Sequence, residues 1–301
     1  MKPLVSVVTV TYNCINANRQ DTLAQCIESV RCQSYDNIEH IIIDGASSDG
    51  TLDFLKSFEG LRIYSEPDSG VFDAFNKGIL RASGKYIVFM NSDDYFSENN
   101  AVEISVSALE NSGSDFSYGD TWLLHEDNPK KSGMRRPMIY KSFTKMPFCH
   151  QSMFCKTDVL KEIGMFDKEN KIASDYEVYL KLLLGGYKGI RVNACIACFR
   201  CGGISGDRIK FIEEYCRVLK KSLDKFCSLS FSEAYDMVQY SSLPLPLIFK
   251  LSKYLNGKDK FIFLAVQFRH FIFQCRARKG QKMLKLFGFY FIKPEPLISL
   301  S

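Results

Sequence analysis

Two adjacent carboxylates are the residues of this chain best suited to hold a metal ion. Asp93 and Asp94 close a tetrad of Asn, Ser, Asp and Asp that directly follows the apolar run of residues 86–90. We expect that run to be a buried strand, so both acids would lie at its carboxyl end, where open α/β sheets bind ligands. Mg²⁺ prefers hard oxygen ligands and commonly binds through one or two carboxylates together with substrate phosphates. The alternative is an ordinary polar turn, because Asn, Ser and Asp are common turn residues.

Polar side chains also follow other strand-like segments or open helices. Thr11 ends the first apolar run, Asp44 ends the second, and Asp175 lies in the first turn of a later helix. Asn76 and Lys77 lie one turn into another expected helix. Each of these could be a capping or turn residue when taken alone. Their repeated position along one edge of a sheet instead favours a ligand site.

The segments that must position these residues alternate between strand and helix patterns. Apolar runs predict strands at residues 4–10, 39–43, 61–65 and 86–90, and helical spacing predicts helices at 21–33, 51–58 and 71–82. Later segments favour strands at 116–124, 151–156 and 190–199 and helices at 158–163, 174–184 and 207–226. This alternation predicts an α/β fold with a mostly parallel sheet and helices on its faces.

The composition is that of a globular protein. The chain has 301 residues, of which 46% are hydrophobic and 24% are charged. Its eleven cysteines lie in apolar or helical segments instead of at the spacings of a disulfide framework. Only three residues precede the first strand-like run, whereas a secretory signal needs a long apolar region. We therefore expect a reducing, cytoplasmic setting.

Charge is divided unevenly along the chain. Residues 240–301 hold 11 of the 39 Lys and Arg but only 2 of the 34 acids. Pro244 and Pro246 interrupt the helical pattern near the start of this basic part. We therefore expect a body of residues 1–240 and a basic, aromatic extension of residues 241–301.

The extension is expected to contain an aromatic helix at residues 258–279. Its apolar part is too short, and too often interrupted by charge, to span a bilayer. The pattern is compatible with attachment to an anionic membrane surface or with packing of the helix against the body. We expect no nucleic-acid partner, because no recognised motif accompanies the basic charge.

The polar segments, taken together, resemble the family 2 glycosyltransferases, which have a GT-A fold. The shared stretches are VSVVTVTYN, DGASSDGT, EPDSGVFDAFNKGI, GKYIVFMNSDD and SDYE, which occur in that family's order over roughly residues 3–205. The chain is most similar to the colanic-acid and exopolysaccharide enzymes of that family. The resemblance implies a UDP-sugar donor, Mg²⁺ or Mn²⁺ as cofactor, and inversion at the anomeric carbon.

The resemblance also implies roles for individual residues. Thr11 would line the nucleotide pocket and Asp44 would hold the uracil. Asp93 would reach the ribose, and Asp94 would bind the metal ion that bridges the diphosphate. Asp175 would be the general base that activates the acceptor hydroxyl.

Some positions carry a weaker implication. Ser174 stands where the family has the Glu of a Glu-Asp pair, which leaves the base in place and any role of that Glu in doubt. Asn76 and Lys77 match a donor-binding helix start. His150 is followed by Gln, a pair that related transferases often carry, and it is expected either to contact a substrate or to be a hydrogen-bonded structural residue. Arg200 and the loop after it could close on the diphosphate.

We therefore expect an inverting glycosyltransferase that builds a surface polysaccharide at the cytoplasmic face of the cell membrane, as a peripheral protein. It would move a sugar from a UDP-sugar to a hydroxyl of a glycan or lipid-linked acceptor. A sugar nucleotidyltransferase is one alternative, but it would need a glycine-rich phosphate loop, and residues 11–19 contain no glycine. A non-catalytic, membrane-attached protein that binds nucleotide-sugars is the other.

Overall fold

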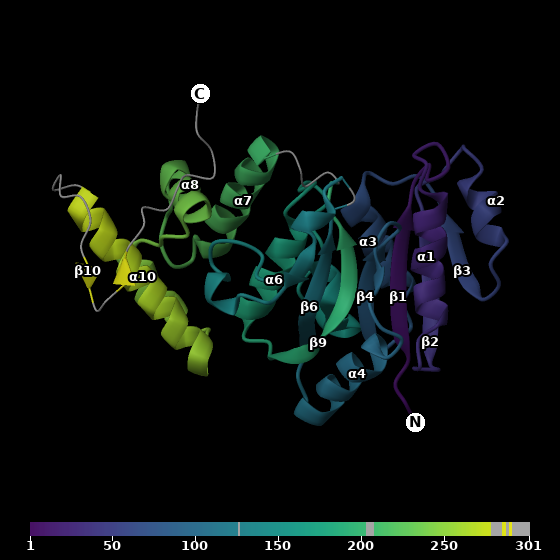
Figure 1. Cartoon of the computed structure of the whole chain (residues 1–301), viewed down its shortest axis with the longest axis horizontal. Coiled ribbons are helices and arrows are strands. Elements are labelled where there is room, and N and C mark those ends of the chain that lie inside the picture. The colour runs from purple at the N-terminus through teal and green to yellow at the C-terminus, as the bar shows by residue number, and fades with distance from the viewer. Residues whose placement is uncertain (126, 203–207, 278–284, 287–288, 291–301) are drawn as a thin grey trace. The chain divides into compact units, whose positions relative to one another are not determined.

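The computed structural model describes residues 1–125, 127–202, 208–277, 285–286 and 289–290 (Figure 1). By its internal contacts the chain divides into two compact units. The first is Met1–Pro137 with Phe148–Asp207, and the second is Met138–Pro147 with Arg208–Ser301. The second unit therefore begins earlier than the residue 241 expected from the two prolines. The reason is that helix α7 (Arg208–Leu223) packs on helix α8 (Phe231–Tyr240), so both belong with the later helices.

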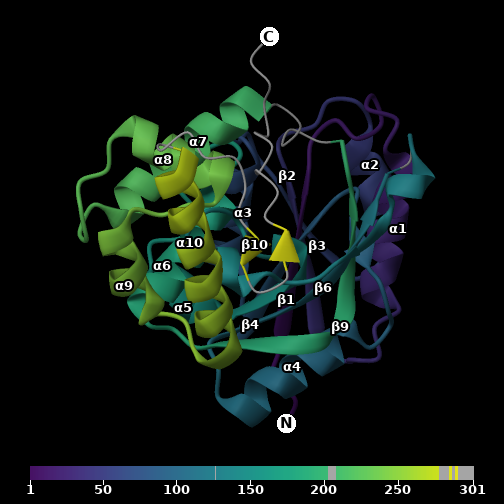
Figure 2. The ribbon, with the colours of Figure 1, turned by 60° about the vertical axis from the view of Figure 1, so that its left-hand side comes forward.

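The first unit is built around a sheet with nine strands among the described residues. They are β1 (Val5–Thr11), β2 (Ile38–Asp44), β3 (Leu61–Ser65), β4 (Tyr86–Asn91), β5 (Tyr95–Phe96), β6 (Phe116–Leu124), β7 (Gly133–Arg135), β8 (Met153–Lys156) and β9 (Gly189–Arg200). Their order is β3-β2-β1-β4-β8-β6-β9-β5, with β7 paired to β6. Strands β1 to β4 are parallel to one another, whereas β8 is antiparallel to both of its neighbours. The long strands β6 and β9 run side by side and parallel (Figures 1 and 2).

The helices of this unit follow the predicted alternation. They are α1 (Gln20–Arg31), α2 (Thr51–Lys56), α3 (Val71–Arg81), α4 (Ala101–Ser112), α5 (Thr157–Glu162) and α6 (Ser174–Gly185), with 3-10 turns η1 (Pro129–Lys131) and η3 (His150–Ser152). The prediction of a mostly parallel α/β sheet with crossover helices is confirmed for β1 and β2, which end in Thr11 and Asp44, and for β4, which Asp93 follows.

The core occupies both faces of the sheet. On one face, α1 and α4 pack against β1 and β4 in a cluster that includes Val7, Val30 and Val88. On the other face, the ring of Phe75 from α3 lies 4.5 Å from that of Phe89 in β4. Burial on both faces explains why the central strands are continuous apolar runs.

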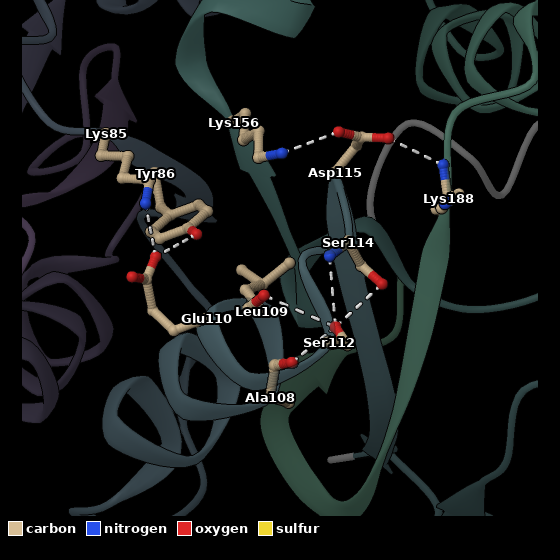
Figure 3. Close-up of polar contacts among 10 residues, drawn as sticks. All are labelled: Lys85, Tyr86, Ala108, Leu109, Glu110, Ser112, Ser114, Asp115, Lys156 and Lys188. Atoms are coloured by element: carbon tan, nitrogen blue, oxygen red, sulfur yellow. Dashed lines mark hydrogen bonds and ion pairs between the residues drawn. The ribbon is translucent and has the colours of Figure 1, made fainter.

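Ion pairs and hydrogen bonds connect neighbouring elements near the start of β4 (Figure 3). Lys85, just before β4, donates to Glu110 of α4 at 2.6 Å, and the Tyr86 hydroxyl donates to the same carboxylate. Lys156 of β8 donates to Asp115 at 2.8 Å. The first two contacts connect α4 with the start of β4, and the third connects β8 with the start of β6. All of them lie at the opposite end of β4 from the polar residues that follow it.

The hairpin formed by β6 and β7 exposes an apolar pair. Trp122 lies directly across from Met134, and 38% and 42% of their surfaces are exposed. Two residues further on, Leu124 pairs with Arg200 of β9. The hairpin therefore ends close to the carboxyl end of β9.

The second unit contains η2 (Ile139–Lys141), α7, α8, α9 (Leu245–Ser252), α10 (Gly257–Ala277) and the short pair β10 (Lys285–Leu286) and β11 (Phe289–Tyr290). The helix expected at 258–279 corresponds to α10. Residues 278–284, 287–288 and 291–301 of the basic extension lie outside the described residues. Among the residues that are described, no helix is long and apolar enough to cross a membrane.

Gly78 sets how closely α3 packs on β1. A methyl group added there would lie 2.4 Å from Cγ1 of Val8. We expect Gly78→Ala to lower the free energy of unfolding by about 1–3 kcal/mol, as overpacking does, although alanine favours a helix by about 1 kcal/mol. Urea unfolding measures the change, and Gly133→Ala is the control because no described atom lies within 4 Å of its added methyl. Unchanged stability of Gly78→Ala would show that this packing is not tight.

His40 of β2 makes the fold sensitive to acid. Its Nε2 lies 3.0 Å from the hydroxyl of Thr9, its Nδ1 is buried without a partner among the described residues, and burial lowers its pKa to about 3. Below pH 6.5 the unfolded chain binds a proton that the folded chain does not, so the stability present above that pH is lost as the pH falls, by about 1.4 kcal/mol per unit for this group.

We therefore expect His40→Gln to remove part of the loss of stability between pH 7.5 and pH 5.0, measured by urea unfolding at both values. His125→Gln is the matched control and keeps the whole loss. An equal loss in His40→Gln and in the unchanged protein would contradict the assignment.

Candidate active site

The carboxylate of Asp94 is the centre of the site. It is fully buried and accepts hydrogen bonds from three separate segments. Asn91 Nδ2 at the end of β4 donates to Oδ2 at 2.9 Å, and Gln151 Nε2 of η3 donates to the same oxygen at 2.6 Å. The backbone N–H of Arg200, the last residue of β9, donates to Oδ1 at 2.9 Å. The site thus lies where β4, η3 and β9 meet.

Electrostatics at this centre favour a nearby positive charge. Burial and, to a smaller extent, the charge of Asp93 raise the pKa of Asp94 to about 6, while the three hydrogen bonds act in the opposite direction. Asp93 itself is 23% exposed at its side chain, and its Oδ2 lies 3.4 Å from Nη1 of Arg19. The guanidinium of Arg200 donates to the backbone carbonyl of Asp93 and lies over the ring of Tyr95. Two guanidinium groups therefore contact Asp93: that of Arg19 lies near its carboxylate, and that of Arg200 binds its backbone carbonyl.

A divalent cation suits this donor set. The described residues contain no group of three or more His, Cys, Asp or Glu that could hold an ion. Mg²⁺, however, keeps several waters and needs only one or two protein carboxylates when phosphates supply the other oxygens. Asp93 and Asp94 offer such carboxylates, and Asp94 Oδ1 accepts a single hydrogen bond from the described part of the chain, which leaves a lone pair.

Thr11 and Asp44 lie together at the ends of β1 and β2. The Thr11 hydroxyl donates to Asp44 Oδ1 at 3.1 Å. The backbone N–H and the hydroxyl of Ser47, at 2.9 and 2.5 Å, and the hydroxyl of Ser65, at 2.7 Å, complete four hydrogen bonds to this buried carboxylate. Three of the donors are hydroxyl groups, which can rotate to other acceptors.

An exposed aromatic ring lies beside this pair. Tyr12 follows β1 directly and is 66% exposed. A methyl group added to Gly45 would lie 2.7 Å from Asp68 Oδ2 and 3.2 Å from Tyr12 Cδ2, so both side chains pack closely over that glycine. An exposed ring beside buried polar groups is the type of surface on which a flat base stacks.

Asp175 lies in the first turn of α6, beside η3. Its Oδ1 accepts the backbone N–H of Tyr176 at 2.7 Å, and its Oδ2 lies 3.6 Å from Nδ1 of His150. His150 and Gln151 are consecutive residues of η3, so this one turn reaches both Asp175 and Asp94. The structure thereby links the predicted base with the predicted metal ligand.

Asn76 and Lys77 are engaged elsewhere. The Asn76 side chain donates to the carbonyl of Phe166 at 2.9 Å and accepts its N–H at 2.9 Å. Lys77 Nζ donates to the carbonyl of Pro67 at 2.6 Å. Both side chains therefore fix the backbone of neighbouring loops.

The fold adds residues to which the sequence pattern assigns no role. Tyr12 lies inside the first shared stretch, so its exposure beside the buried polar groups had a signal in that motif. Arg19 has no such signal in the sequence, because its contact with Asp93 depends on the path of the loop between β1 and α1.

Arg200 is expected from the sequence to close on a diphosphate. In the structure its backbone and side chain bind Asp94, Asp93 and Gln25.

Known proteins share both the sequence pattern and the fold. An uncharacterized glycosyltransferase of Mycobacterium tuberculosis is 35% identical over 192 residues, which are 60% of this chain and 70% of the relative. The putative teichuronic acid biosynthesis glycosyltransferase TuaG of Bacillus subtilis is 29% identical over 209 residues, which are 66% of this chain and 79% of that protein.

Two solved structures have similar folds. The Staphylococcus aureus protein TarS, residues 1–349 in complex with UDP-GlcNAc, matches with a TM-score of 0.60 and 15% identity over 97% of both chains. The mannosyltransferase PcManGT of Pyrobaculum calidifontis, in complex with GDP-Man and Mn²⁺, matches with a TM-score of 0.60 and 16% identity over 94% of this chain and 82% of that one. These similarities show the GT-A fold.

A match to the family described as glycosyl transferase family 2 covers residues 6–162, which is more than half of the chain and includes β1 to β4 and the Asp93–Asp94 pair. The chain therefore belongs to glycosyl transferase family 2.

Proposed function

We propose that this glycosyltransferase moves a sugar from a UDP-sugar to a hydroxyl of a glycan or lipid-linked acceptor, with inversion of the anomeric configuration. The observation that carries the proposal is that two carboxylates from different elements both contact one turn, η3. Gln151 binds buried Asp94, and its neighbour His150 faces Asp175. Asp94 is the carboxylate proposed for the side of the departing diphosphate, and Asp175 the one for the side of the acceptor.

Asp175 is proposed as the general base. It takes the proton of the acceptor hydroxyl as that oxygen attacks the anomeric carbon and the bond to the diphosphate breaks. Base catalysis of this kind contributes about 10²–10⁴-fold. A single displacement with one base inverts the configuration, and the other carboxylates of the proposed set, Asp44, Asp93 and Asp94, are assigned to the nucleotide and the metal ion and not to nucleophilic attack.

The nucleotide is proposed to lie over the ends of β1, β2 and β4. Tyr12 would stack on the base, Asp44 would accept a base N–H when a hydroxyl rotates away, and Thr11 would line the same wall. Asp93 would accept from the ribose. UDP-GlcNAc and GDP-Man in the two structural neighbours support a nucleotide-sugar donor, and the preference for UDP is our expectation from the sequence. Asn76 and Lys77 would act indirectly, by fixing the loops at Phe166 and Pro67.

Asp94, beside Asp93, is proposed to hold Mg²⁺ or Mn²⁺ together with the diphosphate. The bound ion would supply a positive charge that stabilises the leaving group. The Mn²⁺ in the PcManGT complex supports this assignment. The work of the chain itself is to exclude water from Asp94 and to hold both carboxylates in fixed positions.

The proposed biological role is the synthesis of a surface polysaccharide at the inner face of the cell membrane. The similarity to TuaG, named for teichuronic acid biosynthesis, supports the polysaccharide role. For the membrane, the second unit exposes Phe249 on α9 and Phe261 and Phe268 on α10, with Lys250, Lys253, Lys258 and Lys260 exposed around them. Exposed aromatics beside cations are what an interfacial helix presents to anionic lipid.

The donor reaction can be tested without the acceptor. We expect slow release of UDP from one of UDP-glucose, UDP-galactose or UDP-GlcNAc, only with added Mn²⁺ or Mg²⁺. Asp94→Asn should lower the rate at least about 100-fold, because the leaving group loses its stabilising charge, and Asp175→Asn should lower it about 10²–10⁴-fold. Coupled detection of UDP measures the rates, and calorimetry measures donor binding.

Asp53→Asn is the matched control, because Asp53 is an exposed acid that pairs with Lys56 at 3.5 Å on the surface of α2. It should leave the rate unchanged. Full activity of Asp175→Asn would sink the assignment of the base, and release of nucleotide from GDP-mannose alone would overturn the preference for UDP.

The membrane role predicts binding to lipid vesicles. We expect the protein to sediment with vesicles of phosphatidylglycerol and phosphatidylcholine but much less with phosphatidylcholine alone. The triple change Phe249→Ser, Phe261→Ser and Phe268→Ser should weaken this binding at least about tenfold. It removes the apolar side chains that would be buried in the lipid and keeps the cations.

The control is Leu80→Ser with Met134→Ser, which alters exposed apolar residues of the first unit. It should bind the vesicles as the unchanged protein does. Binding that is unaffected by the triple change would remove α9 and α10 from the proposed surface.

A further inference from the structure

His150 is a nearly buried histidine with one ring nitrogen directed at Asp175. Its side chain is 18% exposed, and its Nδ1 lies 3.6 Å from Asp175 Oδ2. Its Nε2 is buried and has no hydrogen-bond partner among the described residues. The edge-on ring of Phe75 lies 5.8 Å away, centre to centre. The two nitrogens therefore have opposite surroundings.

These surroundings decide where the ring carries its proton. A proton on Nε2 would be a buried donor without an acceptor among the described residues, which is unfavourable. A proton on Nδ1 faces a carboxylate. These surroundings favour the neutral tautomer that carries its proton on Nδ1.

Asp175 is restrained from two sides. The N–H of Tyr176 fixes Oδ1 at 2.7 Å, and the Nδ1–H of His150 faces Oδ2. A separation of 3.6 Å is longer than a hydrogen bond, but catalytic hydrogen bonds are often long without substrate and shorten in the productive complex. A shift of a few tenths of an ångström is enough to close this one.

We infer that His150 is a positioning residue, which holds Asp175 as the base by donating its Nδ1–H and keeps that proton throughout the reaction. The inference rests on the proposed role of Asp175. The proton that leaves the acceptor hydroxyl goes to Asp175 and then to solvent. Because Gln151, the next residue, donates to Asp94 at 2.6 Å, one peptide unit sets the spacing between the two carboxylates.

Two substitutions separate this role from simple packing. The amide nitrogen of Asn is as many bonds from Cα as Nδ1 of His, so His150→Asn can still donate to Asp175, whereas His150→Leu fills the space without a donor. We expect His150→Asn to keep UDP release from the active UDP-sugar within about fivefold. His150→Leu should lower kcat about 10–100-fold with an unchanged KM, since a misplaced group costs up to about 10²-fold.

A double substitution tests whether His150 acts through Asp175. In an Asp175→Asn background, His150→Leu should cause no further loss, because residues that act as a unit are not additive. Melting temperatures close to that of the unchanged protein show that each variant folds. Equal activities of His150→Leu and the unchanged protein, with Asp175→Asn inactive, would overturn this inference and leave the proposed function standing.

The tautomer gives a readout that does not depend on activity. In ¹⁵N-labelled protein, two-bond proton–nitrogen correlations should show that the neutral ring of His150 carries its proton on Nδ1. A proton on Nε2 would overturn the inference even in an active enzyme. If the unchanged protein releases no nucleotide from any donor, or if Asp175→Asn is fully active, the proposed function itself fails, and the inference fails with it.

Discussion

A carboxylate that is removed from water organises this molecule. Burying an ionised group costs several kcal/mol unless hydrogen bonds or charges replace the lost water. Asp94 meets this requirement with donors from the end of β4, from η3 and from the end of β9. These segments are far apart in the sequence, so the carboxylate is satisfied only when the whole sheet has assembled in its correct order.

The position of this carboxylate coincides with a change in the direction of the sheet. Strand β4 is parallel to β1 on one side and antiparallel to β8 on the other. Its end is therefore the place where the parallel half of the sheet, β1 to β4, meets the half that carries η3, β6 and β9. Open α/β sheets bind ligands where the strand order reverses, and the polar residues that open α6 face the same turn. The fold thus brings Asp94 and Asp175, the carboxylates proposed for the donor side and the acceptor side, to the same turn η3.

The sequence predicted what depends on local pattern. Apolar runs located β1, β2 and β4, and polar residues at their ends located Thr11, Asp44 and the pair Asp93 and Asp94. It could not predict partners, because the contact between Gln151 and Asp94 spans 57 residues and depends on β8 lying next to β4. The sequence also did not predict the division between the two units at residue 208. Pro244 and Pro246 mark a break in the helical pattern, but they do not show that α7 packs on α8. Asn76 is expected at the donor because it matches a donor-binding helix start of the family; its amide binds the backbone of Phe166, a contact that the local pattern does not reveal.

The exposed hairpin of β6 and β7 gives the molecule a built-in optical probe. Trp122 is the single tryptophan of the chain, and it lies two residues before Leu124, the partner of Arg200. Its emission therefore originates from one known place, on the strand that pairs with the end of β9. The wavelength of this emission depends on the polarity around the indole ring. Binding of a ligand near the end of β9 can therefore be followed as a change in fluorescence, without attaching a dye.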